Sequence, residues 1–415
     1  MMRLLIFAAS IAVVFGGRSP HADYIEETFA NNPDIHPDIL EDAMLDVPGL
    51  LTKYGYPVES HEVVTADNYI LTMHRIPHGR DRNNQPDPNK PIVFLMHGLL
   101  SSSADYLVLG PSTALGYFLA EEGYDVWMGN ARGNFYSRRH VTQNPDHTSF
   151  WRFSWDEIGN FDLKAFIDYI LELTGQTKLH YIGHSQGGTA FLVLNSLRPE
   201  YNEKFISFQG LAPASFFSHN QHPVFTNLAP LESILETAAF AAGIAEVFGS
   251  REFIDWFTST LCNPGSSFEG LCDSAELSGR SDYYNETVLP VILGHAPAGA
   301  SIRQFTHYGQ GIRFNTFRRY NHNAISNFAN YGSFTPPNYD LSRITAPSYL
   351  HYSTKDTLVH PQDVELLSTK LANLQGKFLV PSETFDHLDF IWGSSVRDRL
   401  YEKVLGLMRE AEAKL

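Results

Sequence analysis

Short apolar runs, separated by stretches of helical periodicity, constrain the fold of this chain more than any other feature. Ile92–Met96 is such a run, and its lack of alternation is typical of a strand buried on both faces. Similar runs follow at Asp125–Met128, Leu179–Ile182, Phe205–Leu211, Ser348–Tyr352 and Lys377–Val380. Strands that alternate with helices predict an α/β fold, in which helices cover both faces of a mostly parallel sheet.

The helices between these runs carry start and stop signals. Ser154 and Glu157 have the spacing of a capping box, and the apolar positions after them keep helical spacing until Gly175. A second helix is expected over Gln186–Leu197, and a last one from about Ser395 to the terminus. Before the first apolar run, two β-rich segments at 58–65 and 69–76 flank a turn and predict a hairpin.

The alternation of strands and helices stops between residues 214 and 337 and then resumes. This stretch is aromatic and glycine-rich and has no strand–helix rhythm, so we expect an inserted, mainly helical cap on a continuous sheet. The expected organisation is a signal peptide over residues 1–17, an N-terminal extension over 18–45, a core over 46–213 and 338–415, and the cap over 214–337.

The first residues have the composition of a secretory signal. Arg3 precedes the apolar run Leu4–Phe15, which is too short to span a bilayer, and the small residues Gly16 and Gly17 follow it. The final tripeptide Ala413-Lys414-Leu415 resembles a peroxisomal address, but the N-terminal signal acts first. We therefore expect export to the extracellular space or to a lysosome-like compartment, and we expect no transmembrane segment in the mature chain.

Two internal features agree with export. The chain has two cysteines, Cys262 and Cys272, which are close enough in sequence to bridge a short loop in an oxidising compartment. Asn285 begins an Asn-X-Thr glycosylation acceptor, which has meaning only in the secretory route. The formal net charge of −16 argues against nucleic acid or an anionic membrane as the main partner.

The motif Gly183-His184-Ser185-Gln186-Gly187 follows an expected strand and opens an expected helix. This is the context of a nucleophile elbow, in which a serine on a strained turn projects its hydroxyl above the sheet of an α/β-hydrolase fold. Glycines at both ends are required because neighbouring elements approach the turn too closely for a Cβ. We therefore predict that Ser185 is a nucleophile.

A serine hydroxyl needs a base to remove its proton, and the base needs an orienting acid. In this fold the chain order is serine, acid, histidine, and Asp356 and His387 follow the last two expected strands in that order. Both should therefore lie at the same edge of the sheet as Ser185. The rival groups are Asp363, which is expected to cap a helix, Asp386 and Asp389, which are adjacent to the histidine, and His351 and His360.

The backbone N–H groups of Gln186 and Leu99 are the candidate oxyanion donors. Gln186 directly follows the serine, and Leu99 lies in the loop Met96-His97-Gly98-Leu99-Leu100 after an earlier strand. The 18 histidines are scattered, and no zinc spacing or phosphate-binding glycine motif is present in the sequence. We therefore expect a hydrolase without metal or cofactor.

At this point the sequence resembles the acid lipase family, which contains gastric lipase and lysosomal acid lipase. The resemblance extends over nearly the whole mature chain and is carried by motifs in matching order, which are Tyr54-Gly55-Tyr56-Pro57, Met96–Leu100, Asn130-Ala131-Arg132-Gly133-Asn134, Phe153–Glu157, Leu179–Gly187 and His387–Gly393. It implies that Ser185, Asp356 and His387 form the triad and that Leu99 and Gln186 donate to the oxyanion. It also implies a short cap disulfide and glycans, which suits Cys262, Cys272 and Asn285.

The resemblance implies hydrolysis of triacylglycerols, and of sterol esters in some members, at a lipid–water interface. Two alternatives remain open, which are a secreted short-chain or sterol esterase and a non-catalytic lipid-binding or storage protein on a lipase scaffold. We also expect the segment Ile234–Phe248, with Phe253, Trp256 and Phe257 after it, to form a lid with an apolar inner face. The sequence leaves the oligomeric state open.

Overall fold

The computed structural model describes residues 17–30, 32–81, 83–222, 225–226, 229–248 and 286–415. Its main sheet has the strand order β1-β2-β4-β3-β6-β7-β10-β11, with β5 paired to β2. The strands are β1 (Glu59–Val64), β2 (Tyr69–Ile76), β3 (Ile92–Met96), β4 (Asp125–Gly129), β5 (Arg139–His140), β6 (Leu179–His184), β7 (Phe205–Leu211), β10 (Ser348–Tyr352) and β11 (Leu374–Leu379). The hairpin β1–β2 and the pair β2–β4 are antiparallel, and from β4 to β11 all neighbours are parallel.

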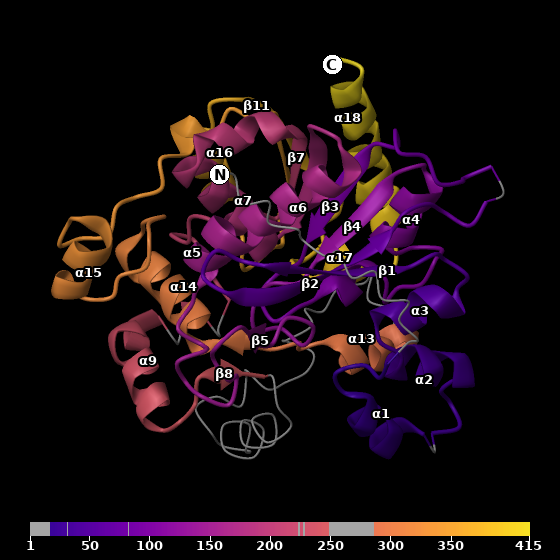
Figure 1. Ribbon diagram of the computed structural model, residues 1–415, viewed down its shortest axis with the longest axis horizontal. Helices are drawn as coiled ribbons and strands as arrows, with labels where there is room; N and C mark the ends of the chain where they lie inside the picture. Colours follow the sequence, from indigo (N-terminus) through magenta and orange to yellow (C-terminus); the bar gives the residue numbers. More distant parts are fainter. Residues whose placement is uncertain (1–16, 31, 82, 223–224, 227–228, 249–285) are drawn as a thin grey trace, which may run out of the picture.

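Helices lie on both sides of this sheet, with α6 and α7 on one side and α4 and α18 on the other (Figure 1). The helices of the described residues are α1 (Ala22–Phe29), α2 (Pro37–Met44), α3 (Val47–Lys53), α4 (Leu115–Glu121), α5 (Trp155–Glu157), α6 (Lys164–Thr174), α7 (Gln186–Leu197), α9 (Glu232–Ala241), α13 (Leu289–His295), α14 (Ile302–Phe314), α15 (Ala324–Tyr331), α16 (Pro361–Ser368), α17 (Asp389–Trp392) and α18 (Glu402–Glu412). The predicted α/β architecture is confirmed.

The central strands are apolar along their whole length because both faces of each strand are covered. All five residues of β3 are buried, as are all residues of β4, β6 and β7. The edge strand β11 has an alternating burial pattern instead. Since an edge strand tolerates polar side chains, the search for an apolar run found only its end, and β11 begins three residues before the predicted Lys377.

The predicted helix after Ser154 is interrupted. Ser154 and Glu157 do form the capping box, and Gly175 ends α6 in the left-handed conformation at φ 70°. Between α5 and α6, however, the wider turns of a π-helix run from Ile158 to Leu163. This segment brings the Asp162 carboxylate to a buried arginine, a role for π-helical turns that periodicity does not reveal.

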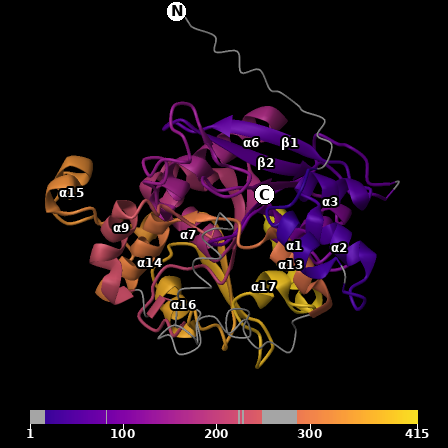
Figure 2. The same cartoon turned by 90° about the horizontal axis from the view of Figure 1, so that it is seen from below.

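Between β7 and β10 the chain forms α9, α13, α14, α15 and a two-stranded sheet of β8 (Glu246–Val247) and β9 (Ala300–Ser301). Figure 2 shows α9, α14 and α15 on one side of the molecule, with α13 on the opposite side beside α1 and α2. The contact of α13 with α2 is close, because a Cβ added at Gly294 would lie 2.0 Å from the carbonyl oxygen of Ala43. The N-terminal helices are thus packed on a helix from a segment 250 residues later, which sequence patterns did not predict.

Candidate active site

Ser185 is the single residue that joins β6 to α7. Its backbone has φ 50° and ψ −116°, a conformation that is strained for any residue with a Cβ. The Ser185 N–H donates to the Leu211 carbonyl (3.0 Å), and its own carbonyl accepts from the Gly188 N–H (2.9 Å). These bonds hold the strained turn, so the expected strand–turn–helix geometry is present.

The glycines of the motif are required by space. A Cβ at Gly183 would lie 2.6 Å from the carbonyl carbon of Gly187, and a Cβ at Gly187 would lie 2.0 Å from the carbonyl oxygen of Met96. Gly188 is equally confined, since its Cβ would fall 2.5 Å from the Pro213 ring. Backbone from β3, β6 and α7 therefore meets around Ser185, as the sequence motif predicted.

Asp356 and His387 are brought together from the loops after β10 and β11. The His387 Nδ1–H donates to Asp356 Oδ2 at 2.8 Å, and both side chains are buried. The other carboxylate oxygen, Oδ1, accepts from the N–H groups of Leu358 (2.9 Å) and Val359 (2.7 Å). The acid is thus fixed by its own loop and presents one oxygen to the imidazole.

This arrangement changes the proton affinity of the histidine. Burial alone would lower the pKa of His387, but the negative charge of Asp356 and its hydrogen bond outweigh burial and raise the pKa above its ordinary value. The hydrogen bond at Nδ1 also places the free lone pair of the neutral ring on Nε2. The His387 imidazole is therefore held in one orientation, and it binds a proton more strongly than a free imidazole does.

A hydrogen bond holds the loop of His387 next to Ser185. His184, which directly precedes the serine, donates from Nε2 to the His387 carbonyl at 3.1 Å, and the two imidazole rings lie 4.9 Å apart between centroids. The loops after β10 and β11 are joined to each other by the Ser353 hydroxyl, which donates to the Phe385 carbonyl at 2.6 Å. The three candidate residues therefore converge at one edge of the sheet.

The rival groups have other partners. His360, not Asp363, is the N-cap of α16; Asp363 lies inside the helix and binds His219 at 3.0 Å, so the expectation that it caps this helix was wrong. The Asp386 carboxylate accepts from the backbone N–H of His387 and not from its ring. His351 is buried in β10 against Gln209.

The loop with Leu99 lies against the nucleophile. A Cβ at Gly98 would lie 3.3 Å from the Cβ of Ser185, so this loop and the elbow are in contact. Of the hydrogen bonds between described residues, none is donated by the backbone N–H of Leu99 or of Gln186. Both candidate oxyanion donors are thus available to a ligand at Ser185.

His97 controls the direction of this loop, a role that sequence reasoning missed. Its Nδ1–H donates to the Gly98 carbonyl at 2.7 Å, and its Nε2 accepts from the Ala131 N–H at 3.1 Å. Burial lowers the pKa of His97 to about 4, so the ring is neutral and keeps this tautomer. Because a peptide's carbonyl and N–H point in opposite directions, holding the Gly98 carbonyl turns the Leu99 N–H away from His97.

Comparisons with known proteins agree with this geometry. Residues 47–110 match the family described as a partial alpha/beta-hydrolase lipase region, and residues 91–229 match the alpha/beta hydrolase fold. Lipase 1 of Drosophila melanogaster is 43% identical over 89% of this chain and 81% of its own length. Gastric triacylglycerol lipase of Bos taurus is 36% identical over 96% of this chain and 98% of its own length.

The chain belongs to the acid lipase family. It is accordingly a carboxylic ester hydrolase of the lipase type. Among solved structures, DcsB in complex with its substrate analogue superposes with a TM-score of 0.54 at 14% identity, over 86% of this chain and 100% of that one, which supports the fold alone.

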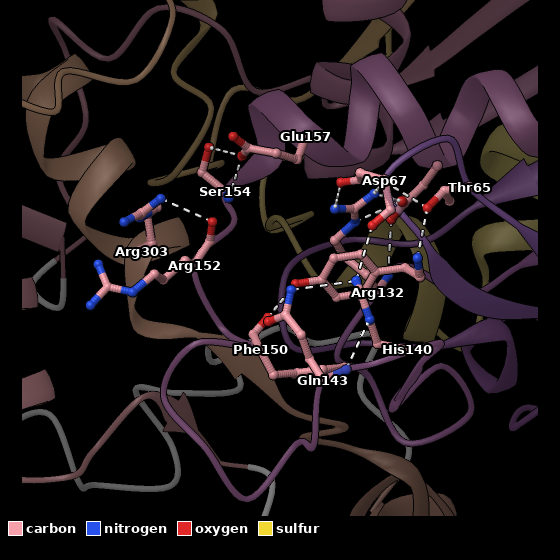
Figure 3. A network of polar contacts seen from close by, with 12 residues as sticks. Thr65, Asp67, Arg132, His140, Gln143, Phe150, Arg152, Ser154, Glu157 and Arg303 are labelled. Carbon is pink, nitrogen blue, oxygen red and sulfur yellow. Dashed lines mark hydrogen bonds and ion pairs between the residues drawn. The ribbon is translucent and has the colours of Figure 1, made fainter. Parts of the chain in front are cut away.

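A buried ionic network surrounds Arg132 of this lipase (Figure 3). Arg132 is fully enclosed and donates to Asp162 (2.7 Å) and to Asp67 (2.6 Å) in the β1–β2 turn. Its guanidinium also lies 3.9 Å from the ring centre of Tyr69. Ala131 directly precedes this arginine, and its backbone N–H donates to His97 Nε2. The ionic network therefore also holds the hydrogen-bond donor of His97 in place.

The side chain of Gln186 is held by the lipase's α14. Its amide nitrogen donates to Gln304 Oε1 at 2.7 Å, and its amide oxygen accepts from the Tyr308 hydroxyl at 3.2 Å. Both partners come from more than 110 residues later in the chain. Only the structure shows this link between the elbow and the α14 segment.

Some expectations fall partly or wholly outside the described residues. Cys262, Cys272, Asn285 and the aromatic residues at 253, 256 and 257 lie there, as do residues 1–16 of the expected signal peptide. Within the described ranges there is no group of three or more His, Cys, Asp or Glu residues that could hold a metal ion. No helix in these ranges is long and apolar enough to cross a membrane.

The close approach at the elbow gives a stability prediction. Gly187→Ala should destabilise the lipase by about 3 kcal/mol or more, because its Cβ would overlap the backbone of β3. Gly406→Ala is the matched control, because nothing lies within 4 Å of its Cβ position in α18, and alanine should be neutral or stabilising there. Equal unfolding free energies of the two variants in urea titrations would contradict the packing described.

Proposed function

We propose that this lipase hydrolyses the carboxylic esters of lipids, chiefly triacylglycerols, with Ser185 as nucleophile, His387 as base and Asp356 as orienting acid. The observation that carries the proposal is the 2.8 Å hydrogen bond from His387 to a carboxylate fixed by two backbone N–H groups, next to a strained serine. A buried acid–histidine pair beside a strand-to-helix serine has the arrangement that acyl transfer requires.

In the first half-reaction the Ser185 oxygen attacks the ester carbonyl, and His387 Nε2 takes the hydroxyl proton. Asp356 stabilises the imidazolium that forms, without accepting its proton. The tetrahedral intermediate then collapses, the bond to the alcohol breaks, and His387 gives its proton to the departing oxygen. A diacylglycerol leaves, and the fatty acyl group remains esterified to Ser185.

The Leu99 and Gln186 N–H groups stabilise the negative oxygen of this intermediate. Donors of this kind act most strongly when their positions are fixed before reaction. The fixed positions here come from His97, which holds the Gly98 carbonyl, and from α7, which begins at Gln186 and directs the positive end of its dipole toward the serine.

In the second half-reaction water replaces the alcohol. His387 takes a proton from the water, the hydroxide attacks the acyl carbon, and the same donors stabilise the second oxyanion. His387 then returns the proton to Ser185 as the fatty acid leaves. No redox group or metal enters this scheme.

The family supports the proposed substrate class and destination. The relatives named gastric triacylglycerol lipase support triacylglycerol as substrate, with sterol esters as a second class to be tested. Of the expected cap, α14 lies beside the proposed site, because its Gln304 accepts from the Gln186 side chain. The N-terminal signal, the Cys262–Cys272 bridge and the Asn285 glycan belong to the same proposal of a secreted or lysosomal protein.

The structure describes part of the segment expected to form a lid, and one of its apolar residues does not face inward. Within the part of 234–248 that was expected to turn its apolar face inward, Phe240 packs on the core and Val247 is buried. Ile234, however, is 59% exposed. The inner face of α9 is thus mixed, since Glu232 and Glu236 form ion pairs there beside Leu235 and Phe240.

The proposed nucleophile is tested by Ser185→Ala. Hydrolysis of emulsified triolein by the purified mature chain should be lost, because water attack without an acyl-enzyme retains only a residual rate, several orders of magnitude below the wild type. Circular dichroism should show an unchanged fold. Fatty acid release by this variant at the wild-type rate would rule out Ser185 as nucleophile.

The proposed acid is tested by Asp356→Asn. The turnover number should fall by about 10⁴-fold, because an amide can donate to Nδ1 and thereby favour the wrong tautomer. Activity needs the neutral imidazole, so in the wild type it is lost as pH falls through the raised pKa of His387. Loss of the Asp356 charge should lower this pKa, and the acid limb of the kcat/KM profile should move to lower pH.

Asp386→Asn is the matched control for this variant. Asp386 lies next to His387 in sequence, but its hydrogen bonds with described residues come from the backbone N–H groups of His387 and Thr357, and asparagine can accept these as well. Its kcat should stay within about tenfold of the wild type. A larger loss in Asp386→Asn than in Asp356→Asn would reassign the acid.

A further inference from the structure

Exposed apolar side chains gather on one side of this lipase. Among the described residues, thirteen large hydrophobic side chains are exposed, and five of them come from α9, α15 and the short segments beside these helices. We call these five residues the cap rim: Leu231, Ile234, Ile325, Phe328 and Phe334. Four of them are more than half exposed, and the most exposed are Ile325 at 82% and Phe334 at 64%.

Helix α15 projects from the body of the molecule. In two perpendicular views it stands outward beyond α14, on the same side as α9 (Figures 1 and 2). It is an ordered projection, because the buried Asn327 amide donates to Asn321 (2.7 Å) and to the Phe334 carbonyl (3.1 Å). Phe328 and Phe334 stack on each other at 5.0 Å between ring centroids.

This projection carries no charge. Residues 321–339 contain no Asp, Glu, Lys or Arg, in a chain with 18% charged residues and a net charge of −16. An exposed loop and helix of this length without a single ionised side chain would be poorly suited to face only water. The projection formed by residues 321–339 is therefore suited to contact an uncharged, apolar surface.

The inner side of helix α9 carries both apolar and charged side chains, and Leu235 and Phe240 pack on the buried cluster beneath it. Glu232 pairs with Arg313 at 2.6 Å and Glu236 with Arg303 at 2.5 Å, and both arginines belong to α14. The charged residues of α9 therefore point inward, and Ile234 points outward. Ile234 is therefore a large apolar side chain left on the outer side of a helix that already has an apolar inner side, and it adds to the exposed apolar residues of α15.

Helix α14 links the segments that carry the cap rim to the Gln186 side chain beside Ser185. α14 leads directly into the α15 projection, pairs with α9, and holds the Gln186 side chain through Gln304 and Tyr308. A surface in contact with the cap rim would thus lie against the segment of the chain that holds the Gln186 side chain. For an enzyme whose substrate forms a separate phase, this is the useful place for a docking surface.

We propose that the cap rim seats the lipase on an uncharged lipid–water surface by inserting its apolar side chains, with Phe328 and Phe334 as the main anchors. This inference rests on the proposed function, because it takes the lipid phase as the partner. The acidic chain disfavours anionic membranes, whereas neutral lipid requires only apolar and aromatic side chains at the interface. The projecting shape of α15 suits insertion into a fluid surface.

The test compares two triple variants in a Ser185→Ala background, so that adsorption is measured without hydrolysis. The rim variant carries Ile325→Ser, Phe328→Ser and Phe334→Ser. The control variant carries Val64→Ser, Val141→Ser and Leu379→Ser, which are similarly exposed (48%, 57% and 48%) on other elements. Co-flotation with phosphatidylcholine vesicles should show adsorption weakened about a hundredfold for the rim variant and unchanged for the control.

The same rim substitutions with Ser185 intact should leave kcat/KM on a dissolved short-chain ester unchanged. Adsorption of the rim variant equal to that of the control would overturn the inference. So would tighter wild-type binding to phosphatidylglycerol vesicles than to phosphatidylcholine, or a dimer in sedimentation that the rim substitutions dissociate. Failure of the intact enzyme to cleave any ester would instead refute the proposed function, since the adsorption assay does not depend on turnover.

Discussion

The backbones of β3, β6 and α7 meet so closely around Ser185 that no side chain larger than hydrogen fits at Gly183 or Gly187. This contact forces the strained conformation of the serine, and the hydrogen bonds to Leu211 and Gly188 retain it. The same contact sets the Gly98–Leu99 loop against the nucleophile. The position of the Gly98–Leu99 loop and the start of α7 therefore both depend on this close packing, which rigid parallel strands can provide.

The electrostatics of the site depend on the hydrogen-bond partners of its acid and its two histidines. The buried Asp356 carboxylate is hydrogen-bonded at both oxygens, since two backbone N–H groups bind one oxygen and His387 binds the other. His97, by contrast, is kept neutral by burial and serves only to direct a carbonyl. Two imidazoles within one site thus have different proton affinities, and the presence of a carboxylate beside only one of them explains the difference.

Much of this could be predicted from the sequence, because local patterns carry it. The apolar runs located the buried strands, the glycine spacing located the elbow, and chain order located Asp356 and His387. The missed features depend on partners distant in sequence. The π-helical turn places Asp162 beside Arg132, and α14 binds the Gln186 side chain. Helix α13 packs against the N-terminal helices α1 and α2. The inward position of the α9 glutamates was missed for the same reason, since their partners are arginines 67 and 81 residues later in the chain.

Reaction with a fluorophosphonate tests the central claim most directly, because this reagent modifies only a serine that is activated by a neighbouring base. After labelling and proteolysis, mass spectrometry should find the phosphonyl group on Ser185, and the rate of its formation should fall by orders of magnitude in His387→Ala. An adduct on another hydroxyl, or an equal rate of labelling in the two proteins, would contradict the account.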